Sequence, residues 1–283
     1  MSETGTLFIV ATPVGNLKDI TYRAVDILGE VDMIACEDTR RTGRLLQHFR
    51  ISKKLVSYHS FNEKSRVEFI SSSLLQGRDV ALVSDAGTPM ISDPGWSLIS
   101  ACVQESVPVV PVPGPSALTA ALSASHLDLS RFFFAGFLPS RSAERKKLMA
   151  ELASLPWGLV FYEAPHRILT MLDELREILG DREVILCREL TKLHEEILRG
   201  TASDVHKILS ERETIKGEIT LLVERGAAKP KTASVPELYT AETIEAEQQR
   251  LRLEGMGKKE IQQQLCRRFN LSRNELYRIL SQF

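Results

Sequence analysis

The sequence lacks a long apolar run and an N-terminal targeting segment. No stretch approaches the roughly 20 apolar residues that a membrane-spanning helix requires. Residues 1–6 contain no basic segment followed by an apolar one, and the apolar stretch after them is too short for a signal helix. We therefore expect a cytoplasmic protein with no membrane partner.

Cysteine is also scarce. Cys36, Cys102, Cys187 and Cys266 lie far apart, and three of them stand in or near apolar runs. Buried thiols are common in such runs, and the wide spacing matches neither a disulfide framework nor a zinc motif. The cysteines therefore indicate neither a disulfide nor a zinc site.

An excess of charge of one sign is missing as well. With a formal net charge of -1, the chain has no global attraction to polyanions, so a nucleic-acid partner has to be held by local basic patches. The 43% hydrophobic and 26% charged residues are typical of a globular protein. A length of 283 residues favours two compact domains plus an appendage.

Short apolar runs alternate with helical patterns over residues 1–115. Such alternation is typical of an α/β domain with a largely parallel sheet. Two helices are predicted at 20–28 and 63–75, with Gly29 and Gly77 as stop signals after the last apolar positions. The predicted strands are 6–10, 31–36, 55–58, 80–83 and 107–112.

Residues 116–228 continue the alternation and predict a second α/β domain. Residues 229–283 predict a linker and a helical, helix-turn-helix-like appendage, with helix breaks at 255–257 and 270–271 and a capping box at 272–275. The strands predicted in the second domain are 132–134, 159–162, 184–187 and 219–223, and the helices are 143–153 and 168–179.

Three loops after predicted strands are dense in glycine and proline. Residues 83–95 follow a strand, and ligands of open α/β sheets bind beside the carboxyl ends of strands. Residues 112–117 open a helix, and residues 11–16 end the first strand without the spacing of a dinucleotide or phosphate loop. The loops predict a site for a small polar ligand; tight turns capped by Asp85 and Asp93 are the alternative.

Together with segments 58–63, 161–167 and 216–220, these loops resemble the tetrapyrrole-methylase superfamily. Within it they look like the branch that methylates ribosomal RNA of the small subunit. The resemblance spans essentially the whole chain. It implies a fold of two α/β domains unlike that of the Rossmann methyltransferases, a homodimer, and S-adenosylmethionine in the cleft between the domains. The usual substrate of that branch is a ribose 2'-hydroxyl of a decoding-centre cytidine, so 16S rRNA in the small ribosomal subunit is the implied partner.

Carried over position by position, the resemblance implies a cofactor site made by both domains. Backbone groups and small side chains suit an apolar adenine, a zwitterionic end and a sulfonium. The implied contacts on the first side are Pro13, Asp85, Ala86, Gly87, Ile91, Ser116 and Ala117. The implied contacts that close over the cofactor are Phe161, Tyr162, Gly217, Glu218 and Ile219.

Methyl transfer from a sulfonium is an in-line displacement that depends mainly on alignment and needs no metal. A ribose hydroxyl also needs a proton acceptor, or a cation that favours its alkoxide. We favour Glu163 with Lys192, although Glu163 as a helix cap and residues 192–196 as a solvated turn remain alternatives. Other candidates are His166, Glu195 and Glu196 as bases and Arg167, Arg188 and Lys216 as cations.

A metal site is not expected. The segment His194-Glu195-Glu196 lacks the H-E-x-x-H spacing of zinc enzymes, and His166 stands alone in the sequence.

Three local basic clusters are candidates for RNA phosphates. A solvated helix face is the alternative for the first two clusters, and dimer packing is the alternative for the third, which lies in the appendage. The candidate contacts are Arg40, Arg41, Arg145, Lys258, Lys259, Arg267 and Arg268.

Other functions remain open at this point. A C-methyltransferase of tetrapyrrole precursors shares the same loops, and a noncatalytic ribosome-assembly factor would use only the basic appendage. A hydrolase with Ser84 or Ser116 as nucleophile ranks last, because neither serine has the G-x-S-x-G elbow.

Overall fold

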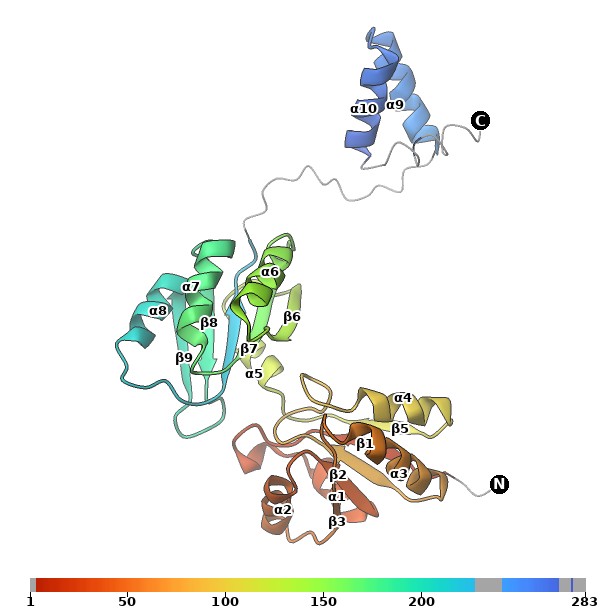
Figure 1. The fold of residues 1–283 in the computed structure, drawn as a ribbon, viewed down its shortest axis with the longest axis vertical. Helices are drawn as coiled ribbons and strands as arrows, with labels where there is room; N and C mark the ends of the chain where they lie inside the picture. The colour runs from red at the N-terminus through yellow and green to blue at the C-terminus, as the bar shows by residue number, and fades with distance from the viewer. Residues whose placement is uncertain (1–3, 227–240, 270–275, 277–283) are drawn as a thin grey trace. The chain divides into compact units, whose positions relative to one another are not determined.

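The computed structural model describes residues 4–226, 241–269 and 276, apart from the side chains of 241, 242 and 267. The chain separates into two compact units, residues 1–227 and 228–283, and the first unit contains both sheets (Figure 1). No helix in the described ranges is long and apolar enough to cross a membrane. The boundary predicted near residue 115, inside the first unit, stays a prediction.

The first sheet is parallel throughout and has the strand order β3-β2-β4-β1-β5. This confirms the prediction of a largely parallel sheet, and each predicted strand end lies within two residues of the observed one. The strands are β1 (Leu7–Val10), β2 (Met33–Cys36), β3 (Lys54–Ser57), β4 (Val80–Val83) and β5 (Val109–Val112).

Helices cover both faces of this sheet because its strands are apolar on both sides. Leu7 packs in a core with α3 and α4, whereas its neighbour Phe8 packs in a core with α1 and α2. The elements are a short 3-10 turn (Leu17–Asp19), α1 (Tyr22–Glu30), α2 (Thr39–His48), α3 (Glu63–Leu75) and α4 (Trp96–Gln104).

One of the two predicted helix stops is wrong. Helix α1 continues through Gly29 to Glu30, and its last bond runs from the Val31 N–H to the Ile27 carbonyl at 3.0 Å. Gly77 follows α3 with a φ of 81°, a left-handed conformation that suits glycine, and this confirms the second stop. Gly29 and Glu30 are both exposed, so the last residues of α1 extend into solvent.

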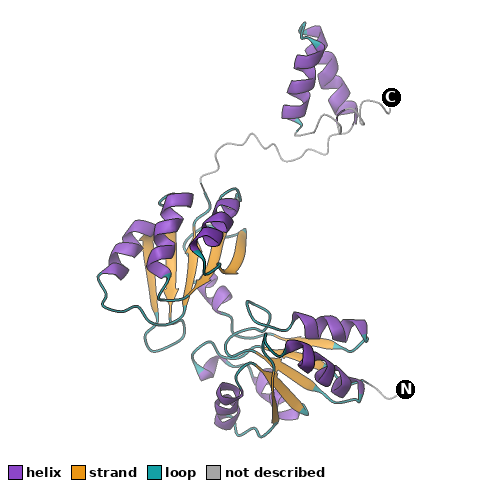
Figure 2. Cartoon of the chain, viewed as in Figure 1, coloured by secondary structure: helices purple, strands orange, loops and turns teal. Residues whose placement is uncertain are grey.

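The second sheet is mixed and has the order β6-β7-β10-β8-β9, with β10 antiparallel to both neighbours (Figure 2). The predicted strands and helices are present. Edge strand β9 and helix α8 were not predicted, because the half-exposed sequence of β9 carries Glu196 and Arg199 and shows no apolar run. The strands are β6 (Phe132–Phe137), β7 (Gly158–Glu163), β8 (Glu183–Arg188), β9 (Glu196–Thr201) and β10 (Ile219–Val223).

The largest core lies between this second sheet and three helices, α6, α7 and α8. The opposite face of the sheet packs on α5. The bounds are α5 (Ala117–Ser123), α6 (Ser142–Leu152), α7 (Ile168–Leu179) and α8 (Ala202–Ser210).

The second unit contains α9 (Ala241–Leu253) and α10 (Lys258–Arg268), which share a small core that includes Ile244 and Leu265. The predicted break is confirmed, because Gly255 has a φ of 81° between the two helices. The capping box predicted at 272–275 and the break at 270–271 lie outside the described residues.

A buried ion pair joins α6 to α7. The Arg145 side chain is 5% exposed, and its Nε donates to Glu174 Oε2 at 2.6 Å. Arg145 Nη1 donates to the carbonyls of Pro139 and Ser140, and Ser142 Oγ donates to Glu174 Oε1. The pair therefore fixes the loop between β6 and α6.

Replacing Arg145 with Leu should lower the free energy of unfolding by about 3–5 kcal/mol, because Glu174 would stay buried without its partner. Urea denaturation measures this change. The matched control is Arg141→Leu, whose side chain is 82% exposed in its pair with Glu144 and should cost less than about 1 kcal/mol. Equal losses of unfolding free energy in the two variants would show that burial does not determine how much the Arg145–Glu174 pair contributes to stability.

Candidate functional site

Three loops at the carboxyl ends of β1, β4 and β5 are tied to one another. The Thr12 N–H donates to the Gly87 carbonyl at 2.8 Å and the Gly87 N–H donates back to the Thr12 carbonyl at 2.9 Å. Thr12 Oγ1 also donates to the Ser84 carbonyl at 3.0 Å, and Thr88 Oγ1 donates to the Pro115 carbonyl at 3.0 Å. These bonds hold the predicted ligand loops as one rigid edge of the sheet.

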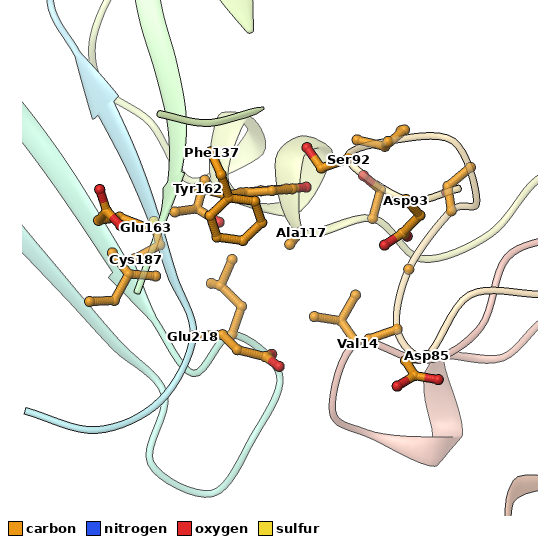
Figure 3. Close-up of a pocket in the computed structure, with 18 of the residues that line it drawn as sticks. Val14, Asp85, Ser92, Asp93, Ala117, Phe137, Tyr162, Glu163, Cys187 and Glu218 are labelled. Carbon is orange, nitrogen blue, oxygen red and sulfur yellow. The ribbon is translucent and has the colours of Figure 1, made fainter. Parts of the chain in front are cut away.

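A cavity of about 410 Å³ lies between this edge and the second sheet, a size within the usual range for a small-ligand site. Figure 3 shows the rings of Phe137 and Tyr162 on the side of the second sheet and Val14 and Asp85 across from them. Predicted cofactor contacts that line the cavity are Asp85, Ala86, Gly87, Ile91, Ser116, Ala117, Tyr162, Glu218 and Ile219.

An aromatic cluster forms one wall. The Tyr162 ring stands 5.0 Å from Phe134 and 5.6 Å from Phe137, measured between centroids, in tilted and edge-to-face arrangements. A bulge in β6 places Gly136, with a φ of 62°, against the loop after β4, where a Cβ at Gly136 would stand 2.7 Å from Ser92 Oγ. Gly136 thus lets the two sheets approach at the cavity.

Carboxylates gather at the other wall. Glu37, Asp85 and Asp93 all line the cavity, and the only cation among its lining residues, Arg41, pairs with Asp85 at 3.3 Å. Burial, and then the negative charge of Glu37, raises the pKa of Asp93 to about 6. Burial, and then the charge of Asp85, raises the pKa of Glu37. This wall favours a ligand that carries positive charge.

Ser116 supplies an unused hydrogen-bonding group. Ser116 lines the cavity, and its buried Oγ makes no hydrogen bond of standard geometry to the described residues, although it lies close enough to the Tyr162 hydroxyl to influence its pKa. Although Ser116 stands at the N-cap of α5, its side chain makes no cap bond. A buried polar atom without a partner is costly, and a ligand that bonds it would remove that cost.

Lys192 lies at the rim, outside the lining residues. Its Nζ donates to Glu189 Oε1 at 2.8 Å and to Glu218 Oε2 at 3.0 Å. Burial lowers the pKa of Lys192, but the bonds to the two carboxylates outweigh it and leave the pKa raised. The stem packs on Gly15, where a Cβ would stand 2.3 Å from Lys192 Cγ. Lys192 is therefore a fixed cation that touches both sides of the cavity mouth.

Glu163 lines the cavity, and its side chain is 0% exposed; its Oε1 is bonded, whereas its buried Oε2 makes no hydrogen bond to the described residues. Its Oε1 accepts from Arg167 Nε and from the Ala164 N–H, each at 2.7 Å. Glu163 shares a strand face with Phe161, whose side chain lies in the largest core. Glu163 is not the helix cap of the alternative interpretation, because the N-cap of α7 is Arg167; its bonds to Ala164 and Arg167 hold the turn before the helix.

Three of the predicted cofactor residues do not line the cavity: Pro13, Phe161 and Gly217. Each is next in sequence to a residue that does line it. Phe161 is fully buried, since alternation along β7 turns Phe161 into the core and Tyr162 toward the cavity. The family resemblance identified the segments that line the cavity. Which side chain of a segment faces the cavity is decided by the register of the strand.

The predicted RNA contacts lie in different surroundings. Arg40 is 82% exposed and pairs with its neighbour Asp38, while Arg41 is 61% exposed at the cavity mouth. Arg145 is buried in its pair with Glu174 and cannot reach a phosphate, so this prediction is corrected. In the second unit, Lys258 and Lys259 are exposed, Arg268 pairs with Glu247, and Arg267 has no described side chain.

Sequence reasoning did not single out Phe137 and Asp93 as cavity residues. Asp93 was considered only as a turn or cap residue. Its distinguishing property is its place among other carboxylates, which depends on β2 lying beside β4 in the sheet. Within the described ranges, no group of three or more His, Cys, Asp or Glu residues is arranged to hold a metal ion.

The chain matches the family of Tetrapyrrole (Corrin/Porphyrin) Methylases over residues 6–206. It is similar in fold to uroporphyrin-III C-methyl transferase from Thermus thermophilus, solved in complex with S-adenosyl homocysteine. That comparison has a TM-score of 0.56 at 18% identity and covers 77% of this chain and 97% of the other. The chain is therefore a member of the tetrapyrrole methylase class.

Two curated relatives narrow the class. The chain is 41% identical to the ribosomal RNA small subunit methyltransferase I of Synechocystis sp. over 97% of each chain. It is 47% identical to the enzyme of the same name from Halalkalibacterium halodurans, over 82% of this chain and 80% of the relative. The chain therefore belongs to the ribosomal RNA small subunit methyltransferase I family of the tetrapyrrole methylases.

Replacing Asp93 with Asn should stabilise the protein above pH 6 and leave its stability unchanged below about pH 4. The folded-state pKa of about 6 lies above the ordinary value of 3.8, so ionisation of Asp93 disfavours the folded state as pH rises through that range. Thermal unfolding across pH measures the difference between variant and wild type. A stability difference between variant and wild type that grows toward low pH would contradict the buried, acidic environment assigned to Asp93.

Proposed function

We propose that this protein transfers a methyl group from S-adenosylmethionine to a ribose 2'-hydroxyl of a decoding-centre cytidine in 16S rRNA. The observation that carries methyl transfer is the cavity between the two sheets, with its acidic wall and the buried Oγ of Ser116. The RNA substrate is supported by the names of relatives that align over 80–97% of their own length. A homodimer and a cytoplasmic location belong to the same proposal.

The cavity fits this cofactor in three respects. Apolar and aromatic groups such as Val14, Ile91 and Tyr162 suit an adenine ring. Asp85 and Asp93 suit a positive charge, and Ser116 Oγ suits a polar end. When bound, S-adenosylmethionine supplies an activated methyl group.

Within the cavity, the residues of this chain hold the acceptor and its proton. Asp93, with a pKa of about 6, is ionised at neutral pH and close to the range in which a general base works best. Lys192 is protonated and faces Glu218 at the rim, where it favours an alkoxide. We therefore place Asp93, in preference to Glu163, as the proton acceptor and keep Lys192 as the cation.

The charges also separate the two substrate classes. A tetrapyrrole precursor carries several carboxylates, and inside this cavity it would face Glu37, Asp85, Asp93 and Glu218. A nucleotide can insert a neutral ribose hydroxyl while its phosphates stay outside. An exposed cation is available there in Arg41 at the cavity mouth.

Transfer of labelled methyl from S-adenosylmethionine to small ribosomal subunits from cells lacking this protein tests the proposal. Nuclease mapping should place the label on one ribose 2'-oxygen. Label on a base, or transfer to a precorrin and not to subunits, would replace the proposed substrate. Cofactor binding without transfer to either acceptor would favour an assembly factor.

Replacing Ser116 with Ala should weaken S-adenosylmethionine binding about 5- to 10-fold, as expected for one lost hydrogen bond. The same change should leave the free protein equally or more stable, because it removes a buried hydroxyl that makes no hydrogen bond of standard geometry to the described residues. Calorimetric titration and thermal unfolding measure the two effects. The matched control is Ser123→Ala on the same helix, whose exposed Oγ bonds the Ala120 carbonyl. Unchanged cofactor affinity in Ser116→Ala would remove Ser116 from the site.

A further inference from the structure

A second cavity, of about 440 Å³, opens beside the first and is rich in cations. Its lining includes Arg188 at the end of β8, His194 in the following loop, and Arg212 and Lys216 in the loop before β10. None of these residues lines the first cavity. The proposed chemistry leaves them without a role.

The two guanidinium groups of this cavity are held in place. Arg188 Nε donates to Glu196 Oε2 at 2.9 Å, and Arg212 donates to both oxygens of Glu196 at 2.6 and 2.8 Å. Arg188 also donates to the Lys216 carbonyl at 3.1 Å and the His194 carbonyl at 3.4 Å. The loops on either side are thereby fixed around the cations, so little ordering is needed when a ligand binds.

Positive charge exceeds negative charge in this cavity. Arg188 and Arg212 share the carboxylate of Glu196, and Lys216 adds a third cation to the lining. The carboxylate of Glu189, which also lines the cavity, is bonded by Lys192 from the rim. Lys216 is exposed, and its Nζ has no ion-pair partner among the described side chains. Part of the donor capacity is therefore free for an anion.

The two cavities adjoin along the chain. Glu189 lines the second cavity, and its Oε1 accepts from the N–H of Glu218, which lines the first, at 3.0 Å. The linings of the two cavities therefore meet at this bond. An acceptor ribose in the first cavity would bring a flanking phosphate to the second.

We propose that Arg188, Arg212 and Lys216 bind a backbone phosphate of the RNA next to the methylated nucleotide, with His194 at the edge of the same site. This inference rests on the proposed function and adds a contact that fixes the register of the RNA. Fixed guanidinium groups suit phosphate oxygens, and phosphate contacts position a nucleic acid without reading its sequence.

The test measures binding of small ribosomal subunits, purified from cells lacking this protein, over a series of salt concentrations. Lys216→Gln should lower the slope of log affinity against log salt by about 0.7–0.9, the value for one phosphate contact. Lys207→Gln is the matched control, because Lys207 is exposed on α8 of the same unit and lines neither cavity. S-adenosylmethionine affinity should be unchanged in both variants.

A Lys216→Gln slope equal to that of Lys207→Gln would overturn the phosphate site while leaving the proposed function intact, provided that the wild type methylates the subunits. If the wild type neither binds nor methylates them, the proposed function fails and this inference fails with it. Lys216→Arg should retain the wild-type slope, since it preserves the charge. If Lys216→Arg lowers the slope of log affinity against log salt as much as Lys216→Gln does, Lys216 has a structural role and does not act through its charge.

Discussion

The site depends on the reciprocal backbone bonds between Thr12 and Gly87. They join the loop after β1 to the loop after β4, two strands that lie side by side in the first sheet. Gly87 has a φ of 85°, which most side chains disfavour, so the closure requires glycine. Without this pair the long loop would have no fixed path, and neither the acidic wall nor Ser116 would face the second sheet in a defined way.

Charge is divided between the two cavities. The first places Glu37, Asp85 and Asp93 at a wall that suits the positive charge of the cofactor, and the second is lined by Arg188, Arg212 and Lys216. Both sets lie at strand ends, yet the chain as a whole is nearly neutral. This arrangement explains how a protein with no bulk attraction to RNA would hold a cationic cofactor and a polyanionic substrate together.

The fold was largely predictable from the sequence, because apolar runs and glycine-rich turns mark most strands and their ends. The edge strand β9 was missed because its exposed side is polar, and the helix stop assigned to Gly29 was wrong because α1 continues to Glu30. For the site, the motifs identified the loops but not the side chains. Phe161 and Tyr162 differ only by strand register, and the role of Asp93 arises from carboxylates that are distant in sequence. Arg145 looked like a surface cation because its partner Glu174 is on another helix.

Hydrogen exchange with and without S-adenosylhomocysteine tests most directly whether both sheets form one cofactor site. The account predicts slower amide exchange in residues 84–95 and 114–118 on one side and in 217–220 on the other. Residues 241–269 should exchange at the same rate in both conditions, because they form a separate unit. Protection confined to the loops of a single sheet, or no protection at saturating ligand, would contradict a site shared by the two sheets.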